Sequence, residues 1–369
     1  MTSIPASETL QQIQRRLLDW YDGHRRPLPW RDALDPYRVL VSEVMLQQTR
    51  AETVAPYYER WTARFPTVEA LAESDQEEVL GLWSGLGYYS RARNLHRTAM
   101  IVRDRHDGWI PDSVEALREL PGIGEYTAGA VASIAFGRCE PAVDGNARRV
   151  LSRLFDLEAP TPGEFRRLAG ALVPGDRPGD FNQALMELGA RVCRPRSPDC
   201  ESCPLRTSCL SRVRGTVDLR PARRRRKRIP NYAIGTAVIV SATDRTLLVR
   251  RPVNGLLGGM WEYPGLETDH GEDPIDAAGR AVRELLGNVP LKSWLDGGEP
   301  SYELAEIGHT FSHRRHRYHA FGFRTGSEPV PDLSSGSWTE ARWCSTGALA
   351  ELPLSAAQRK LAKIVGVRC

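Results

Sequence analysis

The chain has 369 residues, of which 41% are hydrophobic and 26% charged, and a formal net charge of +4. These values are ordinary for a globular protein, and the length predicts two domains. No apolar run approaches the roughly 18 residues of a membrane span, and the N-terminus lacks the basic start and apolar stretch of a signal peptide. A cytoplasmic protein without a membrane anchor is therefore expected.

The first part of the chain, residues 8–210, has the apolar periodicity of helices. Its first helix carries one apolar face formed by Leu10, Ile13, Leu17 and Leu18. Similar periodicity and Gly/Pro punctuation predict further helices at 76–83, 91–104, 113–119, 125–136, 146–156 and 181–191. No alternation typical of strands competes, so an all-α domain is expected.

A short motif, Leu120-Pro121-Gly122-Ile123-Gly124, lies between two of these helices. Glycines at 122 and 124 allow a tight turn with positive φ and a close backbone approach. The next helix would present free N–H groups to an anion such as a DNA phosphate. The motif alone also fits an ordinary helix–helix turn, so both interpretations stay open.

Four cysteines follow the helices with the spacing C-x6-C-x2-C-x5-C: Cys193, Cys200, Cys203 and Cys209. Four thiolates on one short loop indicate an iron–sulfur cluster or a metal. A disulfide framework is disfavoured because a chain of this size can bury a core without it. Zinc remains open, although four-cysteine zinc sites usually show two close pairs. The other cysteines, Cys139, Cys344 and Cys369, have no such spacing and are expected to be ordinary thiols.

The second part begins after a basic stretch. Residues 212–228 hold nine Lys/Arg and one acid, which predicts a linker suited to a polyanion such as nucleic acid. After Pro230 the pattern changes, and β-branched or alternating runs predict strands at 233–241, 246–250 and 317–323, with helices at 274–286 and 355–365. This half is therefore expected to be α+β.

The order of hairpin motif, Asp144 and cysteine loop resembles the helix–hairpin–helix DNA glycosylases with an iron–sulfur cluster, the endonuclease III and MutY superfamily. Four further stretches resemble the MutY adenine glycosylases. They are residues 28–31 (LPWR), 42–49 (SEVMLQQT), 85–94 (GLGYYSRARN) and 181–189 (FNQALMELG). Together the motifs span most of residues 25–209. With this context the cysteine loop is expected to hold a structural [4Fe–4S] cluster.

The resemblance implies roles for two carboxyl groups. Glu43 would be a general acid that delivers a proton to adenine N7, and Asp144 would stay ionised and stabilise an oxocarbenium ion at C1′. Tyr126 and Asn146 would support them. Glu43 must be buried for its pKa to rise; as a lone residue it would otherwise be a solvated surface glutamate, and Asp144 an ordinary helix cap.

Position 126 separates the branches of the superfamily. Endonuclease III-like enzymes carry a lysine after the hairpin, which forms a Schiff base with the sugar, whereas this chain carries Tyr126. A phenol cannot form an imine. The sequence therefore predicts a monofunctional glycosylase, which removes the base without cutting the strand.

The resemblance also implies residues that contact DNA, because the target base must leave the duplex to be reached. Gln48 and Tyr88 would fill the gap beside the estranged base. The ordinary alternatives are a solvent-facing helix position for Gln48 and aromatic core packing for Tyr88. The expected adenine pocket and the remaining DNA contacts consist of Trp30, Arg31, Leu46, Thr49, Gly122, Gly124 and Glu187. Ala51 departs from the family, which often has a β-branched residue there.

Residues 232–369 resemble a Nudix-type, MutT-like module, beginning with the stretch 255–264 (GLLGGMWEYP). The counterpart of its metal-binding helix is 283–288, where Gly287 and Asn288 replace the two expected acids. Pyrophosphate hydrolysis is therefore not expected, and the module is interpreted as a reader of 8-oxoguanine. The expected reader is the loop Phe311, Ser312 and His313, whose hydroxyl and backbone groups can test for the N7–H of the lesion. A basic surface turn that binds phosphates is the alternative.

The sequence thus predicts a multi-domain protein: an all-α helix–hairpin–helix domain with an iron–sulfur loop at 8–211, a linker at 212–231 and an α+β Nudix-like domain at 232–369. The expected function is excision of adenine paired with 8-oxoguanine or guanine in double-stranded DNA. A cytoplasmic, nucleoid-associated monomer is expected, with the linker as a docking site for repair or replication proteins. The alternatives are a bifunctional pyrimidine glycosylase/lyase, a non-enzymatic DNA-binding iron–sulfur protein and a nucleotide pyrophosphohydrolase.

Overall fold

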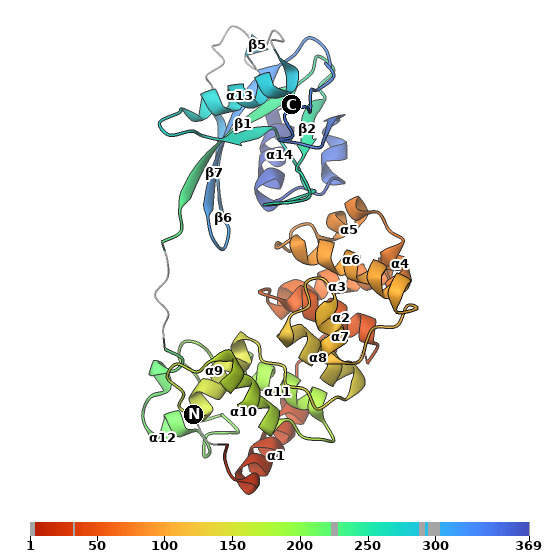
Figure 1. The fold of residues 1–369 in the computed structure, drawn as a ribbon. Helices are drawn as coiled ribbons and strands as arrows, with labels where there is room; N and C mark the ends of the chain where they lie inside the picture. Colours follow the sequence, from red (N-terminus) through yellow and green to blue (C-terminus); the bar gives the residue numbers. More distant parts are fainter. Residues whose placement is uncertain (1–3, 32–33, 223–227, 288–291, 294–302, 369) are drawn as a thin grey trace. The chain divides into compact units, whose positions relative to one another are not determined.

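The computed structural model describes residues 4–31, 34–222, 228–287, 292–293 and 303–368. Its contacts divide the chain into two compact units, which Figure 1 shows in sequence colours. The first unit comprises residues 1–73 and 94–225, and the second comprises residues 74–93 and 226–369. The second unit thus includes a segment from the middle of the expected helical domain. The domain boundaries of the sequence analysis remain predictions.

The first unit is helical. Its elements are α1 (Ser7–His24), α2 (Pro36–Leu46), α3 (Ala51–Arg64), α4 (Val68–Ala72), most of α6 (Ser90–Arg105), α7 (Val114–Glu119), α8 (Glu125–Phe136), α9 (Gly145–Leu154), α10 (Pro162–Leu172), α11 (Pro178–Arg191), α12 (Leu210–Val213) and the 3₁₀ turn η1 (Val217–Leu219). Across the residues that the structure describes, no helix combines the length and the apolar character needed to cross a membrane.

Local sequence signals explain where several of these helices begin. Proline occupies the first turn of α2, α10 and α11, where its missing N–H costs nothing. The side chain of Asp35 accepts a hydrogen bond from the Arg38 N–H at the start of α2. Thr161 and Glu164 form a reciprocal capping box on α10. These caps fix the starting points of the helices that carry the site.

The core of this unit is formed by one face of α1 packed on α9, α10 and α11. It contains, among others, Ile13, Leu17, Val150, Leu151, Leu168, Phe181 and Leu185. Helices α9 and α11 approach closely at Gly189, because a Cβ there would lie 2.6 Å from the Asn146 Cβ. This close approach brings the start of α9, with Asp144 and Asn146, against α11.

The second unit contains α5 (Gln76–Trp83) and a mixed sheet. The strands are β1 (Asn231–Val240), β2 (Thr246–Arg250), β3 (Trp261–Glu262), β4 (Gly265–Glu267), β5 (Lys292–Ser293), β6 (Glu303–Thr310), β7 (Arg315–Arg324) and β8 (Glu340–Cys344). The main order is β3-β2-β1-β7-β5, with β4 beside β1, β6 beside β7 and β8 beside β2. Strands β1 and β7 are parallel, and the other pairs are antiparallel.

Helices cover both faces of this sheet (Figure 1). Helix α13 (Pro274–Leu286) packs on residues of β1, β2 and β7 such as Ile239, Val249 and Phe323. Helix α14 (Ala356–Arg368) and the 3₁₀ turn η2 (Gly347–Ala350) contribute to the core on the other face, with Val238 and Leu248. The β6–β7 hairpin extends from this core, and the expected lesion-reading loop joins its two strands.

The expected fold class, an all-α domain followed by an α+β domain, is confirmed. Helices α5 and α13 span the residues expected for them, and β2 spans residues 246–250 as expected. Strands β4, β5, β6 and β8 were not expected. Part of the basic stretch differs from a solvated linker: Arg214 and Arg220 pair with the Asp156 carboxylate at 3.0 and 2.9 Å, and the Thr216 hydroxyl donates to it at 2.6 Å. Asp156 therefore holds residues 214–220 on the first unit. Residues 223–227 lie outside the described residues.

Candidate active site

Glu43 and Tyr126 form the centre of the candidate site. Glu43 lies on α2 and is only 4% exposed, which excludes the solvated surface position considered above. Tyr126 lies in the first turn of α8, directly after the hairpin motif. The Tyr126 hydroxyl donates a hydrogen bond of 2.5 Å to Oε2 of Glu43. A buried carboxyl thus has a fixed orientation set by a neighbouring helix.

The environment of Glu43 favours its protonated form. Burial, followed by the negative charge of Asp144, raises the pKa of Glu43 to about 7. The hydrogen bond from Tyr126 and the positive charge of Arg31 act in the opposite direction. A carboxyl group with a pKa near 7 is half protonated at neutral pH, which is the property that a general acid requires.

Asp144 is the N-cap of α9, and its Oδ1 accepts the Ala147 backbone N–H at 2.6 Å. Its Oδ2 accepts the Asn146 amide N–H at 2.9 Å. The pKa of Asp144 lies above its usual value, because the effect of burial outweighs the opposing effect of these hydrogen bonds. Asp144 can therefore both cap α9 and act in a site. The capping hydrogen bonds fix the orientation of its carboxylate, and the helix N-terminus favours the negatively charged form.

Arg149, one turn further along α9, links this carboxylate to the cysteine loop. Its guanidinium donates to Asn146 Oδ1 at 2.8 Å and to the Cys193 carbonyl at 2.8 Å. It also donates to the Gly189 carbonyl at 2.8 Å. Asn146 in turn donates to Asp144, so a continuous chain of hydrogen bonds runs from Cys193 to Asp144.

The residues expected to line the adenine pocket lie nearby in the first unit. Arg31 donates to the Tyr21 hydroxyl and the Gln183 amide oxygen, at 2.9 and 2.8 Å. Its second terminal nitrogen reaches Glu187, 2% exposed, at 2.9 Å. Arg26 donates to both carboxylate oxygens of Glu187, at 2.7 and 3.0 Å.

The other residues expected to contact adenine or DNA are Trp30, Leu46 and Thr49. Trp30 is buried and packs edge-on against Tyr58, with ring centroids 5.5 Å apart. Leu46 is the last residue of α2, and the Thr49 N–H donates to its carbonyl at 3.2 Å. The sequence analysis did not single out Arg26. Its position four residues before Trp30 gave no periodic or motif signal.

Met186 is another contact that the sequence analysis missed. It lies on α11, next to Glu187, and its Sδ is 3.2 Å from the Tyr126 hydroxyl. Its side chain is half-buried. No motif chemistry points to a methionine, because a thioether is neither titratable nor a strong hydrogen-bonding group.

The hairpin motif joins α7 to α8. Gly122 has φ = +77°, and a Cβ there would lie 2.7 Å from the Asn94 amide nitrogen. The positive φ expected at Gly122 is therefore confirmed. The turn favours glycine there for two reasons, the positive φ and the close approach of Asn94. The expectation of positive φ at Gly124 is wrong, since its φ is −90°. Gly124 is instead the exposed N-cap of α8, and a Cβ added there would meet no described atom within 4 Å.

The two residues expected to enter the DNA helix share an unusual backbone conformation. Gln48 has φ = +57° and Tyr88 has φ = +48°, although neither is glycine. Both are exposed, Tyr88 by 45%. Non-glycine residues in this region carry strain that neighbouring structure must maintain, and such residues cluster at functional sites.

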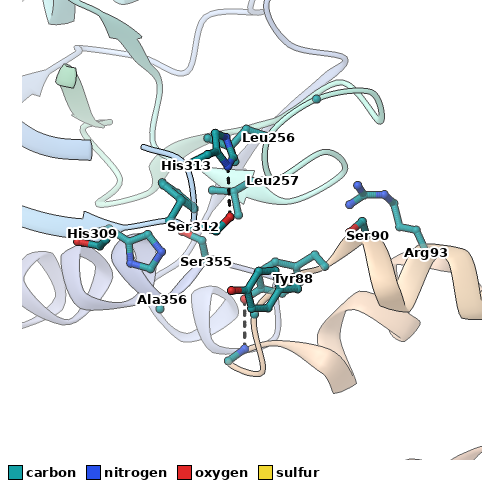
Figure 2. Close-up of a pocket in the computed structure, with 16 residues that line it drawn as sticks. Tyr88, Ser90, Arg93, Leu256, Leu257, His309, Ser312, His313, Ser355 and Ala356 are labelled. Atoms are coloured by element: carbon teal, nitrogen blue, oxygen red, sulfur yellow. Dashed lines mark hydrogen bonds between the residues drawn. The ribbon is translucent and has the colours of Figure 1, made fainter. Parts of the chain in front are cut away.

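Within the second unit, Tyr88 and the expected lesion-reading loop line one cavity of about 380 Å³ (Figure 2). Its lining also includes Arg93, Leu256 and Leu257. The Ser312 hydroxyl lies 3.4 Å from His313 Nδ1, and both residues are exposed. Phe311 packs against His309 and His316, with ring centroids 4.5 and 5.0 Å apart. The structure thus brings together residues separated by more than two hundred positions in sequence.

The four loop cysteines line a second cavity, in the first unit, together with Arg153, Arg206 and Arg212. The Arg153 guanidinium donates to Cys193 Sγ at 3.3 Å. Burial and the neighbouring thiols raise the pKa of Cys203 to about 12, so without a bound cation this group is a neutral thiol at neutral pH.

The spacing of these thiols bears on the choice between zinc and a cluster. Tetrahedral Zn–S bonds of about 2.3 Å place sulfur atoms roughly 3.8 Å apart. Among the described residues, no three cysteine sulfurs lie within 4.8 Å of one another. The four sulfurs are therefore spaced more widely here than the donors of one tetrahedral zinc ion.

The counterpart of the Nudix metal-binding helix ends early. Helix α13 stops at Leu286, and Gly287 follows with φ = +62° and ψ = −140°. A glutamate at that position would be strained and would lie beyond the helix. Asn288 lies outside the described residues. Glu284, the remaining acid, has one carboxylate oxygen that is buried without a partner among the residues described.

Comparisons with known proteins agree with this architecture. Residues 41–174 match the model of the HhH-GPD superfamily base excision DNA repair proteins, and residues 235–363 match the NUDIX domain. The chain is 35% identical to adenine DNA glycosylase of Rattus norvegicus, over 95% of this chain and 77% of that protein. It is 44% identical to adenine DNA glycosylase of Mycolicibacterium smegmatis, over 77% of this chain and 98% of that protein.

Among solved structures, a thermostable thymine-DNA glycosylase is similar to part of the chain. The match has a TM-score of 0.53 and 30% sequence identity, and it covers 56% of this chain and 98% of that protein. The similarity supports the helix–hairpin–helix fold.

Proposed function

This chain belongs to the adenine DNA glycosylases, and from that premise we propose that it excises adenine paired with 8-oxoguanine or guanine in duplex DNA without cutting the strand. Members of this family are base-excision repair enzymes that hydrolyse N-glycosyl bonds. The observation that carries the proposal is the buried Glu43, held by Tyr126 and coupled to Asp144.

Glu43 supplies the proton. Adenine is a poor leaving group as an anion, so N7 must be protonated as the glycosidic bond breaks. The raised pKa of Glu43, about 7, keeps a large protonated fraction at neutral pH. The hydrogen bond from Tyr126 occupies Oε2, which leaves Oε1 to carry the proton to the base. After the base departs, the Glu43 carboxylate can position the attacking water.

Asp144 stabilises the sugar. Loss of adenine leaves positive charge on C1′, and an ionised carboxylate nearby lowers the energy of that state. The hydrogen bonds from Ala147 and Asn146 favour the charged form of Asp144. Burial thus favours the protonated form of Glu43, whereas hydrogen-bond donors favour the charged form of Asp144. Two acids in different environments can in this way take the two roles.

The pocket network holds the base. Glu187, on α11, is fixed by Arg26 and Arg31, and Trp30, next to Arg31 in sequence, is buried. A buried ion network of this kind orients an amide-like base edge with little rearrangement. Leu46 and Thr49 end α2 beside it, and the hairpin with Gly122 and Gly124 would bind a backbone phosphate through the N-terminus of α8.

Tyr126 excludes lyase chemistry at its position, because a phenol cannot form the imine on which β-elimination depends. A bifunctional glycosylase/lyase is therefore disfavoured. The end of α13 at Gly287 similarly disfavours nucleotide pyrophosphate hydrolysis.

Lesion recognition is assigned to the cavity of Figure 2. Ser312 and His313 offer donors and acceptors at the lining, and Tyr88 offers an exposed ring held at positive φ. A base stacked on Tyr88 would face these polar groups, which can distinguish the N7–H of 8-oxoguanine from the bare N7 of guanine. Gln48 would fill the stack on the adenine strand.

The cysteine loop fits a [4Fe–4S] cluster held by Cys193, Cys200, Cys203 and Cys209. When bound, the cluster would order the loop and would take no part in hydrolysis, because base excision transfers no electrons. Arg149 and Arg153 would then hold the ordered loop against α9. Iron, sulfide and zinc analysis of the purified protein tests this assignment.

The decisive experiment is single-turnover excision on a duplex with one A:8-oxoG pair, with and without alkali. Strand breaks only after alkali are expected, because the product is an intact abasic site. Breaks without alkali, in protein free of contaminating lyase, would contradict the argument from Tyr126. Absence of an abasic product from protein with a full iron content would contradict the function.

A further inference from the structure

Met186 contacts the hydroxyl of Tyr126, the same group that donates a hydrogen bond to Glu43. Its Sδ lies 3.2 Å from the Tyr126 hydroxyl, whose oxygen is also 2.5 Å from Glu43 Oε2. The hydroxyl has a single proton to donate. Two acceptors, a carboxyl oxygen and a thioether sulfur, therefore compete for one proton.

We propose that Met186 is a positioning residue, whose weakly accepting thioether fills the space beside Tyr126 so that the tyrosine proton stays on Glu43. This inference rests on the proposed function of Glu43 as the general acid. A thioether is a weak acceptor, whereas an amide or hydroxyl oxygen in the same place would compete effectively. An apolar contact also excludes a water molecule that could accept the proton.

The direction of the tyrosine proton matters for the acid. While Tyr126 donates to Oε2, protonation of Glu43 on Oε1 is favoured, because the carbonyl-type oxygen is the better acceptor for the phenol, and Oε1 can then offer the proton to the base. If Tyr126 turned to another acceptor, Glu43 could donate its own proton to the phenol oxygen instead. The acid would then be present but wrongly oriented, and proton transfer depends on that geometry.

The other groups around Glu43 cannot replace Tyr126 in orienting its carboxyl group. Asp144, at the start of α9, and Arg31, before α2, act on Glu43 through charge, with opposite effects. From α11, Glu187 is already bound by Arg26 and Arg31. Tyr126, from α8, therefore provides the hydrogen bond that orients the acid, and Met186 is its other close polar neighbour on α11.

The matched variants are Met186→Leu and Met186→Gln in the full-length protein. Leucine conserves volume without an acceptor, and glutamine conserves the unbranched shape but adds a strong one. Each is made in the wild-type background and with Tyr126→Phe, which removes the hydroxyl for which they compete. Single-turnover adenine excision is measured from about pH 5.5 to 9, with duplex affinity and thermal melting measured in parallel.

Met186→Gln is expected to excise adenine more slowly than Met186→Leu, on the order of tenfold, with unchanged duplex affinity. The alkaline limb of its pH profile should move to higher pH, because the Tyr126 bond that lowers the pKa of Glu43 is weakened. In the Tyr126→Phe background, the two substitutions should behave alike.

Two outcomes would overturn the inference: equal rates for the glutamine and leucine variants, or a difference of the same size without the Tyr126 hydroxyl. The second would place the effect of glutamine elsewhere than on the tyrosine proton. Failure of the proposed function is separable, because it would appear as wild-type excision by Glu43→Gln. With an inactive Glu43→Gln and equal Met186 variants, only the positioning role is lost.

Discussion

The two units hold a carboxyl group in contrasting ways. In the first unit, Glu43 is buried, hydrogen-bonded by Tyr126 and shifted to a pKa of about 7. In the second unit, Glu284 remains on α13, but the helix ends at Gly287, where a Nudix hydrolase would continue with acids. A shared fold therefore does not preserve chemistry, which depends on the environment that surrounds each group.

The proposed recognition residues differ from the proposed catalytic ones in exposure. Glu43 is 4% exposed, whereas Ser312 and His313 lie exposed at the tip of the β6–β7 hairpin. An acid needs exclusion from water to raise its pKa, while a reader of the opposite base must project toward DNA. Breaking each feature separately tests whether catalysis belongs to the first unit and discrimination to the second.

The largest effect is expected for Glu43→Gln, which retains the shape and removes the transferable proton. Single-turnover adenine excision should fall by roughly 10²- to 10⁴-fold, the range that general acid catalysis contributes. Duplex affinity, measured by anisotropy, should stay close to wild type. Excision at the wild-type rate would remove Glu43 from its role.

A smaller effect is expected from pH. Because the pKa of Glu43 is raised to about 7, the acid is protonated below that pH and loses its proton above it. The single-turnover rate should therefore decline as pH rises through about 7, approaching tenfold per pH unit well above it. Duplex affinity over the same range is the control. A flat profile from pH 6 to 9 would contradict a titrating general acid.

Ser312→Ala with His313→Ala should leave excision chemistry intact and reduce discrimination. The ratio of rates for A:8-oxoG over A:G should fall by about tenfold, as expected for the loss of one or two hydrogen bonds to the lesion. Arg315→Ala is a matched control on the same hairpin, since it removes a charge without touching the polar pair. An unchanged ratio would move lesion recognition away from the loop.

The smallest effect is expected for Glu284→Gln. If the second unit has no hydrolytic role, adenine excision should remain within about twofold of wild type, as for substitutions away from functional contacts. Release of pyrophosphate from 8-oxo-dGTP should be undetectable before and after the change. Hydrolysis by the wild type that this substitution abolished would show that the second unit retains Nudix chemistry.

Several features were predictable from sequence because they are local. The helices α5 and α13, the glycine turn at 122 and the cap at Asp144 follow from periodicity, backbone freedom and short-range hydrogen bonding. The cysteine spacing likewise indicated a metal or cluster site. The resemblance to the adenine glycosylases, now confirmed by the comparisons, rested on ordered motifs of the same kind.

Other features depend on contacts between distant segments. Arg26 lies outside the quoted motifs, and Met186 lies inside one without a predicted role. They contact Glu187 and Tyr126 over separations of 161 and 60 residues. The positive φ of Gln48 and Tyr88 is imposed by the surrounding structure, because their own side chains disfavour it. The expected positive φ at Gly124 was wrong because the start of α8 uses an extended N-cap there.

The sequence by itself indicated an all-α part followed by an α+β part, a loop with four cysteines and the absence of an amine at position 126, since each follows from residue identity and short-range spacing. Tertiary structure alone decided the burial and pKa of Glu43, because desolvation is a sum over helices that meet only in the folded chain. It also decided that Tyr88 lines one cavity with Ser312 and His313. Nothing in either local sequence specifies the other, so their proximity comes from packing.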